Sequence, residues 1–313
     1  MLIEIGNLIL ALILIWISAS IIVEYAKKIA KAFNISEAFI GLTILSIGTS
    51  LPEIFTHIMA SINILNGIES SGIAVGTNIG SNIIQITLIL GVIALLTKVK
   101  TDNKILKMDY PIMLGAILFL FFLSLNQYIG RIEGFFLVSA YIIFIVWLSK
   151  KEKIIKKNPH KLELFHFLSL IVGFALLIIS AKSVVNNAVS LSQIWGVSES
   201  LIGVLIIGTA TALPELTTAL IAILRGSTSM SLGTLIGSNI TNPLFALGIG
   251  AMISGYTIDA SILWYDLPFW FFISLLAMLF FKRKMLLEKK EAITLIIFYI
   301  AYAILRIKYL AHI

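Results

Sequence analysis

Long apolar segments recur along the whole chain, and the polar residues gather between them. Most of these segments hold about 20 residues, enough for a helix to cross a bilayer core of roughly 30 Å. The pattern predicts an all-α polytopic membrane protein with no large soluble domain. We expect ten transmembrane helices, at residues 5–23, 37–64, 71–97, 110–126, 132–149, 164–190, 198–224, 230–254, 260–281 and 292–310.

Two sequence blocks occur twice in this pattern. SEAFIGLTILSIGTSLPE at 36–53 aligns without a gap with SESLIGVLIIGTATALPE at 198–215. Further on, GTNIGSNIIQ at 76–85 aligns with GTLIGSNITN at 233–242. The repetition indicates that the two halves of the chain share one architecture.

Five spans in each half is an odd number, so the halves enter the membrane from opposite sides. We therefore expect two inverted five-helix repeats, at residues 1–149 and 164–313, joined by a polar cytoplasmic linker at 150–163. Inverted repeats of this kind place a binding site near the bilayer midplane, where interrupted helices meet.

The basic residues lie almost entirely in alternate loops. All but four of the 23 lysines and arginines fall in the loops that follow the odd-numbered spans. The positive-inside rule places those loops in the cytoplasm, so both termini are expected outside the cell. The net charge of +7 is thereby explained by topology, and no nucleic-acid partner is expected. The sequence thus predicts a multi-pass protein of the cell membrane, whose surroundings are the lipid bilayer.

Two glutamates lie deep in the apolar segments. Of the 16 acidic residues only Glu53 and Glu215 do so, at matching places in the two repeats. A carboxylate at membrane depth is costly unless it faces a cavity or a partner. No lysine or arginine matches in both halves, so the simplest partner is a bound cation. The preceding prolines, Pro52 and Pro214, lack an N–H and interrupt the helix, which releases backbone carbonyl oxygens.

The polar residues of the repeated blocks are oxygen donors. Two carboxylates with neighbouring hydroxyls and amides can supply the 6–8 oxygen ligands that Ca²⁺ prefers. Zinc or copper would need histidine or thiolate ligands, and the chain has no cysteine. Two carboxylates neutralise one divalent ion and repel each other when empty, so replacement cations are needed, as in an antiporter. The candidate ligands are Glu53, Glu215, Thr49, Thr211, Ser81, Gln85, Ser238 and Asn242.

Several features have simpler explanations. One LPE tripeptide could be a mere kink, but two matched copies favour a site. GTNIG and GTLIG fit the GxxxG pattern of close helix packing, which is compatible with a nearby ion site. His57 lies one turn after Glu53, but its repeat partner is Ala219, which favours a structural role. An ion channel would need a continuous pore, and an enzyme would need a Ser/His pair or an HExxH motif, so neither is favoured.

The GTSLPE block followed by GxxxGSN, repeated in inverted halves of five spans, resembles the cation/calcium exchanger superfamily. Within it the chain is most similar to archaeal sodium/calcium exchangers, over essentially its whole length. The resemblance implies exchange of Ca²⁺ for Na⁺ by alternating access, with spans 1 and 6 sliding past an eight-helix core. We expect no cofactor, no enzymatic activity and no obligatory protein partner. The resemblance implies Glu53 and Glu215 as central calcium ligands, with Thr49, Ser50, Ser81, Gln85, Thr211, Ser238 and Asn242 at the other ligand positions.

The chain departs from the family pattern at four positions in or next to the repeated motifs. Ala210 and Ala212 replace the glycine and the serine of the motif in the second half, which removes one hydroxyl from a sodium site. Gln85 stands where asparagine is common, and Asn242 occupies a position that is aspartate in some relatives. Calcium transport is expected to survive, because both glutamates remain. The alternative counter-ion is H⁺, carried by the same glutamates; the missing hydroxyl favours H⁺ and the remaining hydroxyls favour Na⁺.

Overall fold

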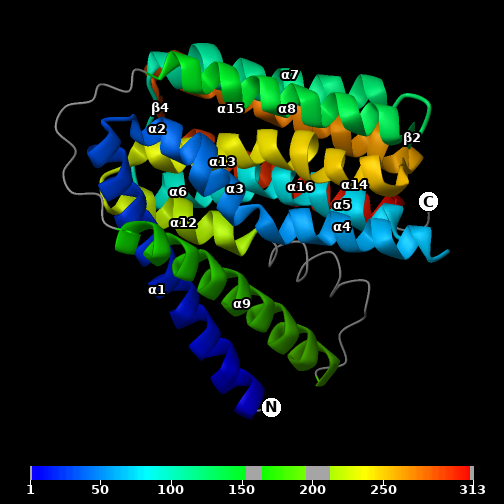
Figure 1. The fold of residues 1–313 in the computed structure, drawn as a ribbon, viewed down its shortest axis with the longest axis horizontal. Helices are drawn as coiled ribbons and strands as arrows, with labels where there is room; N and C mark the ends of the chain where they lie inside the picture. The colour runs from blue at the N-terminus through cyan, green and yellow to red at the C-terminus, as the bar shows by residue number, and fades with distance from the viewer. Residues whose placement is uncertain (1, 153–163, 195–211, 311–313) are drawn as a thin grey trace. The chain divides into compact units, whose positions relative to one another are not determined.

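The computed structural model describes residues 2–152, 164–194 and 212–310 of the 313-residue chain. These residues are helical apart from turns and four strands of two residues each (Figure 1). The chain forms two compact units. The first unit holds Met1–Pro52 and Glu152–Thr234, and the second holds Glu53–Lys151 and Leu235–Ile313. Each unit therefore draws on both halves of the sequence.

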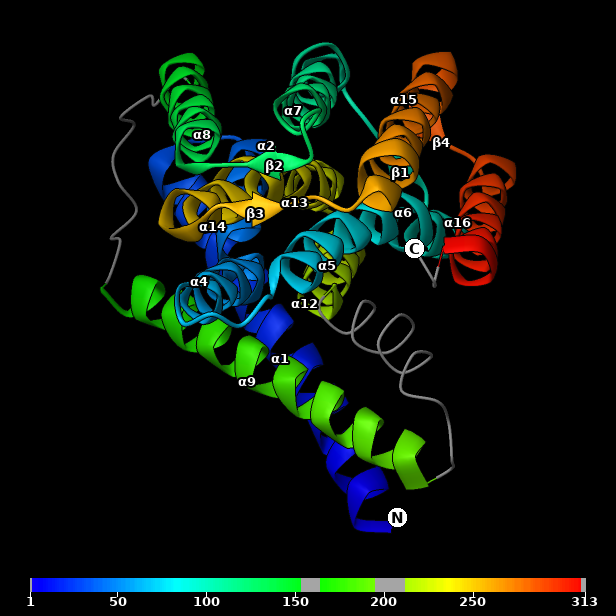
Figure 2. The same cartoon turned by 90° about the vertical axis from the view of Figure 1, so that its right-hand side faces the viewer.

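The first unit is built around two long helices, α1 and α9, which lie side by side (Figures 1 and 2). Small residues let them approach closely: a side chain at Gly173 of α9 would lie 2.8 Å from Ile22 of α1. The helices of this unit are α1 (Leu2–Phe33), α2 (Glu37–Ile40), the π-helical turn η1 (Gly41–Leu45), α3 (Ser46–Thr49), α9 (Leu164–Ile194) and α12 (Leu213–Leu224). Two more, α4 (Leu51–Leu65) and α13 (Thr228–Thr241), continue into the second unit.

The second unit packs helices around a core that includes the buried rings of Trp270, Tyr110 and Phe281. Two short antiparallel pairs, β1 with β4 and β2 with β3, join its loops (Figure 2). Besides α4 and α13 its elements are α5 (Ser71–Ile84), η2 (Gln85–Ile89), α6 (Leu90–Leu96), β1 (Val99–Lys100), η3 (Ile105–Asp109), α7 (Tyr110–Leu123), β2 (Tyr128–Ile129), α8 (Arg131–Lys151), η5 (Asn242–Ala246), α14 (Leu247–Ser254), β3 (Tyr256–Thr257), η6 (Ile262–Asp266), α15 (Leu267–Lys284), β4 (Leu286–Leu287) and α16 (Lys289–Leu310).

In the second unit, α6 and α14 hold equivalent places in the repeat, and a glycine lets each of them pack closely on another helix. A side chain at Gly91 of α6 would lie 3.0 Å from the Ala292 carbonyl oxygen of α16. One at Gly248 of α14 would lie 3.0 Å from Leu137 of α8. The helices α6 and α14 therefore each pack closely on one partner.

Several of the described helices are long and apolar enough to cross a membrane. Seven qualify by length and composition, and a bent pair around Ser50 makes an eighth if it is counted as one span. Their outer faces are also apolar: Ile132 and Ile143 of α8 are 69% and 67% exposed, as befits contact with lipid. The prediction of an all-helical membrane protein is confirmed at this level. The predicted seventh span lies partly outside the described residues, and the predicted tenth, in α16, is not among the helices that qualify, so the count of ten stays a prediction.

One boundary differs clearly from the sequence-based prediction. The first span was predicted to end at residue 23, but α1 continues to Phe33 and carries Lys27, Lys28 and Lys31 in its last turns. Lysine is a good helix former, so leaving the apolar zone does not end a helix. Asn34 ends it by adopting a left-handed conformation, with φ of 51°.

The same order of local elements occurs twice in the second unit. The turns η2 and η5 begin at Gln85 and Asn242, and the same interval separates η3 from η6 and β1 from β3. The π-helical turn is rare and often marks a functional place in a helix. Both Gln85 and Asn242 are candidate ion ligands, so the irregular turns start at residues of interest.

Candidate functional site

The helix breaks at the first repeated motif. α3 ends at Thr49 and α4 begins at Leu51, and the two helix axes differ by 43°. Between them Ser50 has φ of −81° and ψ of 3°, outside the helical region. The predicted interruption at GTSLPE is therefore confirmed. Pro52 falls in the first turn of α4, where its missing N–H costs little.

The second motif has the same local geometry where it is described. Ala212, the repeat partner of Ser50, has φ of −88° and ψ of 0°, and α12 begins at the next residue. Pro214 again lies in the first helical turn, just before Glu215. Thr211 lies outside the described residues, as does the rest of the segment before it. The two LPE tripeptides thus open helices in the same way.

The first unit holds Thr49, Ser50 and Glu215 among the candidate ligands, all with fully buried side chains. The Thr49 hydroxyl donates to the Leu45 carbonyl at 3.0 Å, as hydroxyls in helices often do. The Ser50 hydroxyl has no hydrogen-bond partner within the described part of the chain. Its oxygen lone pairs are thus available to a ligand.

Glu53 is the first candidate ligand in the second unit. Its side chain is only 3% exposed, and neither carboxylate oxygen has a hydrogen-bond partner among the described residues. A buried carboxylate without compensation is among the costliest groups in a protein. The described residues also contain no cluster of three or more histidines, aspartates or glutamates. A cation here would be held by few carboxylates and many neutral oxygens, as the sequence predicts.

The remaining candidates lie on α5, α13 and the turns that follow them. The Ser81 hydroxyl donates to the Asn78 carbonyl at 3.1 Å, and Ser238 is fully buried. Gln85 and Asn242 are also fully buried. The structure brings Ser81, Gln85, Ser238 and Asn242 into one unit with Glu53.

Two asparagines that the sequence analysis did not single out form hydrogen bonds with the side-chain amides of Gln85 and Asn242. Asn239 Nδ2 donates to Gln85 Oε1 at 2.8 Å, and Asn242 Nδ2 donates to Asn82 Oδ1 at 3.1 Å. Each bond leaves one buried atom without a partner in the described chain: Gln85 Nε2 in the first case and Asn242 Oδ1 in the second. Both asparagines end a GSN tripeptide, at Asn82 and Asn239, so the signal that could have found them is the repetition of that motif.

His57 belongs to a third polar group in the same unit. Its Nε2 lies 2.9 Å from Asn78 Nδ2, and its Nδ1 lies 3.2 Å from the Tyr256 hydroxyl. Ser61, one turn further along α4, donates to the Gly250 carbonyl at 2.8 Å. The histidine is 1% exposed and fully integrated into the packing, which agrees with the structural role that its unmatched repeat position favours.

The second glycine motif also serves helix packing, whereas the packing interpretation is wrong for GTNIG, where a side chain at Gly76 or Gly80 would meet nothing within 4 Å. Within the first unit a side chain at Gly233 of α13 would lie 2.7 Å from the Ala38 carbonyl oxygen. One at Gly41 would lie 2.9 Å from the Thr234 nitrogen. The first glycine of GTLIG is therefore needed for close approach, which confirms the packing interpretation at this position.

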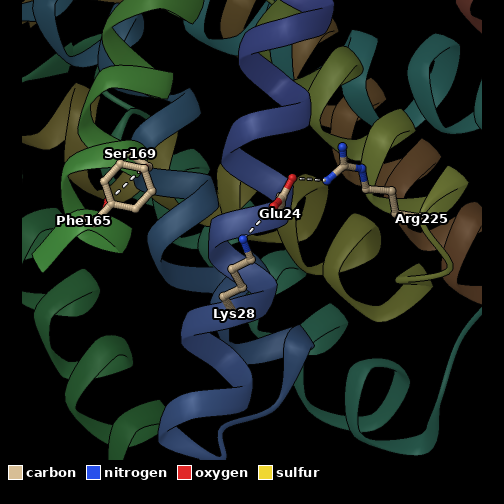
Figure 3. Close-up of polar contacts among 5 residues, drawn as sticks. All are labelled: Glu24, Lys28, Phe165, Ser169 and Arg225. Carbon is tan, nitrogen blue, oxygen red and sulfur yellow. Dashed lines mark hydrogen bonds and ion pairs between the residues drawn. The ribbon is translucent and has the colours of Figure 1, made fainter. Parts of the chain in front are cut away.

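An exposed polar cluster ties α1 to the end of α12 (Figure 3). Glu24 forms ion pairs with Lys28 at 2.7 Å and with Arg225 at 3.6 Å. Lys27 Nζ also donates to the Arg225 carbonyl at 2.9 Å. All these groups are partly or well exposed, so each bond adds little to stability. Nothing in this cluster resembles the buried amides of the second unit.

Comparison with known proteins agrees with these features. The model of the sodium/calcium exchanger protein family matches residues 3–150 and 165–308. The sodium/calcium exchanger MaX1 of Methanosarcina acetivorans is 28% identical over 95% of this chain and 96% of its own. The inner membrane protein YrbG of Escherichia coli is 32% identical over 83% of this chain and 82% of its own.

A solved structure extends the agreement to the fold. The sodium-calcium exchanger NCX_Mj, soaked with 2.5 mM Na⁺ and 10 mM Sr²⁺, matches with a TM-score of 0.85 and 29% sequence identity, covering 99% of both chains. The predicted resemblance to archaeal exchangers is thereby confirmed. The chain is a member of the sodium/calcium exchanger family, a multi-pass membrane antiporter for calcium and a second cation.

Proposed function

We propose that the chain exchanges Ca²⁺ for Na⁺ by alternating access, with Glu53 and Glu215 as the central calcium ligands. The observation that carries the proposal is the Glu53 carboxylate. It is buried directly after a broken helix, and the described residues offer it no hydrogen bond. A cation would supply the missing compensation, and a member of this family has a cation as its cargo.

The other ligands in this proposal are neutral oxygens. Ser50 Oγ and Asn242 Oδ1 support it, because both are buried and have no partner in the described residues. A neutral amide or hydroxyl oxygen suits both Ca²⁺ and Na⁺, which are hard cations. The full proposed set is Glu53, Glu215, Thr49, Thr211, Ser50, Ser81, Gln85, Ser238 and Asn242.

We further propose that ten spans form two inverted repeats, with both termini outside the cell. The recurrence of η2, η3 and β1 as η5, η6 and β3 supports the repeat. The crowding of basic residues into alternate loops supports the orientation. In this arrangement residues 1–149 and 164–313 are the repeats, and 150–163 is the cytoplasmic linker.

A proton-coupled exchanger is the second candidate. It keeps Glu53 and Glu215 and lets each carry one proton in place of sodium. Ala212 favours it, because the matching residue in the first half, Ser50, has a hydroxyl that Ala212 lacks. The hydroxyls of Thr49, Ser50, Ser81 and Ser238 favour sodium.

Uptake of radioactive calcium into proteoliposomes separates these candidates. We expect an outward sodium gradient to drive uptake and an outward proton gradient to leave it at background. Uptake driven only by protons would replace sodium by H⁺ and keep the glutamates. If neither gradient moves calcium, the substrate assignment is wrong.

Substitution of the glutamates tests the site itself. We expect Glu53→Gln or Glu215→Gln to abolish calcium uptake, because each removes a negative charge that the divalent ion requires. Glu69→Gln is the matched control: Glu69 is exposed, and its hydrogen bond from the Ser71 side chain lowers its pKa, so the control also removes an ionised carboxylate. Normal uptake by either site variant would contradict the proposal.

A further inference from the structure

Thr218 of α12 has a hydroxyl that is buried without a hydrogen bond. Its side chain is fully buried, and Oγ1 has no partner within the part of the chain that the structure describes. Other helical threonines donate to the carbonyl four residues back, as Thr43 does at 2.6 Å, Thr217 at 2.7 Å and Thr234 at 2.9 Å. Thr218 makes no such bond to the Pro214 carbonyl. Because an unpaired buried hydroxyl is costly, its oxygen needs an explanation beyond packing.

The position of Thr218 in α12 brings its side chain close to Glu215. The two residues are three apart in one helix, and residues at this spacing are neighbours on the helix surface. Helical side chains lean toward the N-terminus, so Thr218 leans back toward the turn that holds Glu215. Leu216, Leu220 and Leu224 mark the less buried face of α12. Glu215 and Thr218 lie on the opposite face, and both are fully buried.

This face of α12 belongs to the same compact unit as other candidate ligands. Within the first unit α12 packs against α3, the helix that ends at Thr49 just before the break at Ser50. The residues next to Thr218 on the buried face are small, at Ala219 and Ala222. Neither can offer the Thr218 hydroxyl a hydrogen bond, because an alanine side chain has no polar atom.

Each central glutamate has one unpartnered buried hydroxyl three residues away among the described residues. In the first half this is Ser50, three residues before Glu53. In the second half the residue that matches Ser50 is Ala212, which has no hydroxyl. There the free hydroxyl is that of Thr218, three residues after Glu215. The second half therefore offers a free hydroxyl on the other side of its glutamate.

We propose that Thr218 is a further sodium ligand, whose hydroxyl oxygen shares a Na⁺ with the Glu215 carboxylate. The inference rests on the proposed function, because it takes Glu215 to be an ion ligand and Na⁺ to be the counter-ion. A hydroxyl adds an oxygen ligand without adding charge. One carboxylate with neutral oxygens balances a monovalent cation, whereas Ca²⁺ relies on the two carboxylates together.

Replacing Thr218 by valine tests the proposal, because it removes the hydroxyl and keeps the branched shape. We expect Thr218→Val to raise the sodium concentration for half-maximal calcium exchange by roughly tenfold, as changes around metal sites do. Exchange of calcium for radioactive calcium without sodium should change much less. Thr218→Ser keeps the hydroxyl and should keep the normal sodium response.

Thr217→Val is the matched control. Thr217 is the neighbouring threonine and is only 8% exposed, but its hydroxyl already donates to the Leu213 carbonyl. Its removal should leave the sodium response unchanged. Sodium-dependent protection against thermal unfolding gives the same comparison for a variant that binds ions but does not transport them.

Three results would overturn the role of Thr218 while leaving sodium/calcium exchange intact. The first is a normal sodium response in Thr218→Val, and the second is an equal loss in Thr217→Val or Thr218→Ser. The third is an equal loss of sodium-free calcium exchange in Thr218→Val, which would remove the preference for sodium. Absence of sodium-driven calcium uptake by the unaltered protein would instead overturn the proposed function, and the role of Thr218 with it.

Discussion

Two amide pairs occupy matching places in the sequence repeat, yet their hydrogen bonds run in opposite directions. Asn82 accepts from Asn242, whereas Asn239 donates to Gln85. The cause of the second direction is Trp270, whose indole N–H can only donate and lies 2.9 Å from Asn239 Oδ1. With its oxygen engaged there, Asn239 has only its nitrogen to offer Gln85.

The comparison teaches that a motif does not fix the chemistry of its residues. The same GSN tripeptide ends in an acceptor at Asn82, whose nitrogen is engaged by Asn78, and in a donor at Asn239, whose oxygen is engaged by Trp270. One half therefore leaves an oxygen over, at Asn242, and the other leaves an amide nitrogen over, at Gln85. In the proposed site, the two nearly symmetrical halves therefore offer a cation different free atoms.

Replacing Asn242 and Gln85 separately is the strongest test of the difference between the two amide pairs. We expect Asn242→Leu to weaken calcium binding by roughly tenfold or more, because it removes the unpartnered oxygen that we propose as an ion ligand. Gln85→Leu should weaken it less, because the Gln85 oxygen already accepts from Asn239 and only its nitrogen is free. Half-maximal calcium concentrations for uptake provide the measurement. Equal losses in the two variants would mean that the direction of the hydrogen bonds does not matter.

Trp270→Phe tests the donor that engages the oxygen of Asn239. The change leaves Asn239 Oδ1 buried without its donor, which costs about 1–3 kcal/mol of folding stability. Asn239 Nδ2 still donates to the Leu235 carbonyl at 2.9 Å, so the direction of its bond to Gln85 is kept. We expect a lower melting temperature in detergent without weaker calcium binding. A loss of calcium affinity as large as that of Asn242→Leu would show that Gln85 already contributes an oxygen.

The exposed ion pairs of the first unit give the smallest expected effect. Glu24→Gln removes the pairs with Lys28 and Arg225, but these groups are well solvated and screened by salt. We expect an unchanged melting temperature and unchanged calcium affinity. A clear loss of calcium affinity would mean that this cluster, and not only the buried amides, controls the site.

Much of the architecture could be predicted from the sequence because its physical signals are local. Apolar length gave most spans, and the proline before Glu53 predicted the break that the structure has at Ser50. The end of α1 could not be predicted, because lysines allow a helix to continue beyond the apolar zone.

The roles of the site's amides were beyond the reach of sequence patterns. The partner of Asn82 lies on a span far away in the chain, and the direction of each bond depends on a third residue, Asn78 or Trp270. A local motif contains neither piece of information. The ligand set itself, from Glu53 to Asn242, stays a prediction.

The π-helical turns at Gln85 and Asn242 have a consequence for helical phase. Each wider turn holds one additional residue, and an additional residue rotates everything after it by roughly 100° about the helix axis. The asparagine before each turn contacts the first residue of the other turn, Asn82 with Asn242 and Asn239 with Gln85, while Gly91 and Gly248 after the turns face α16 and α8. One continuous helix thus packs against two neighbours that lie in different directions. Deleting one residue from either turn would rotate the part of the helix after the turn, so that it could no longer contact both neighbours.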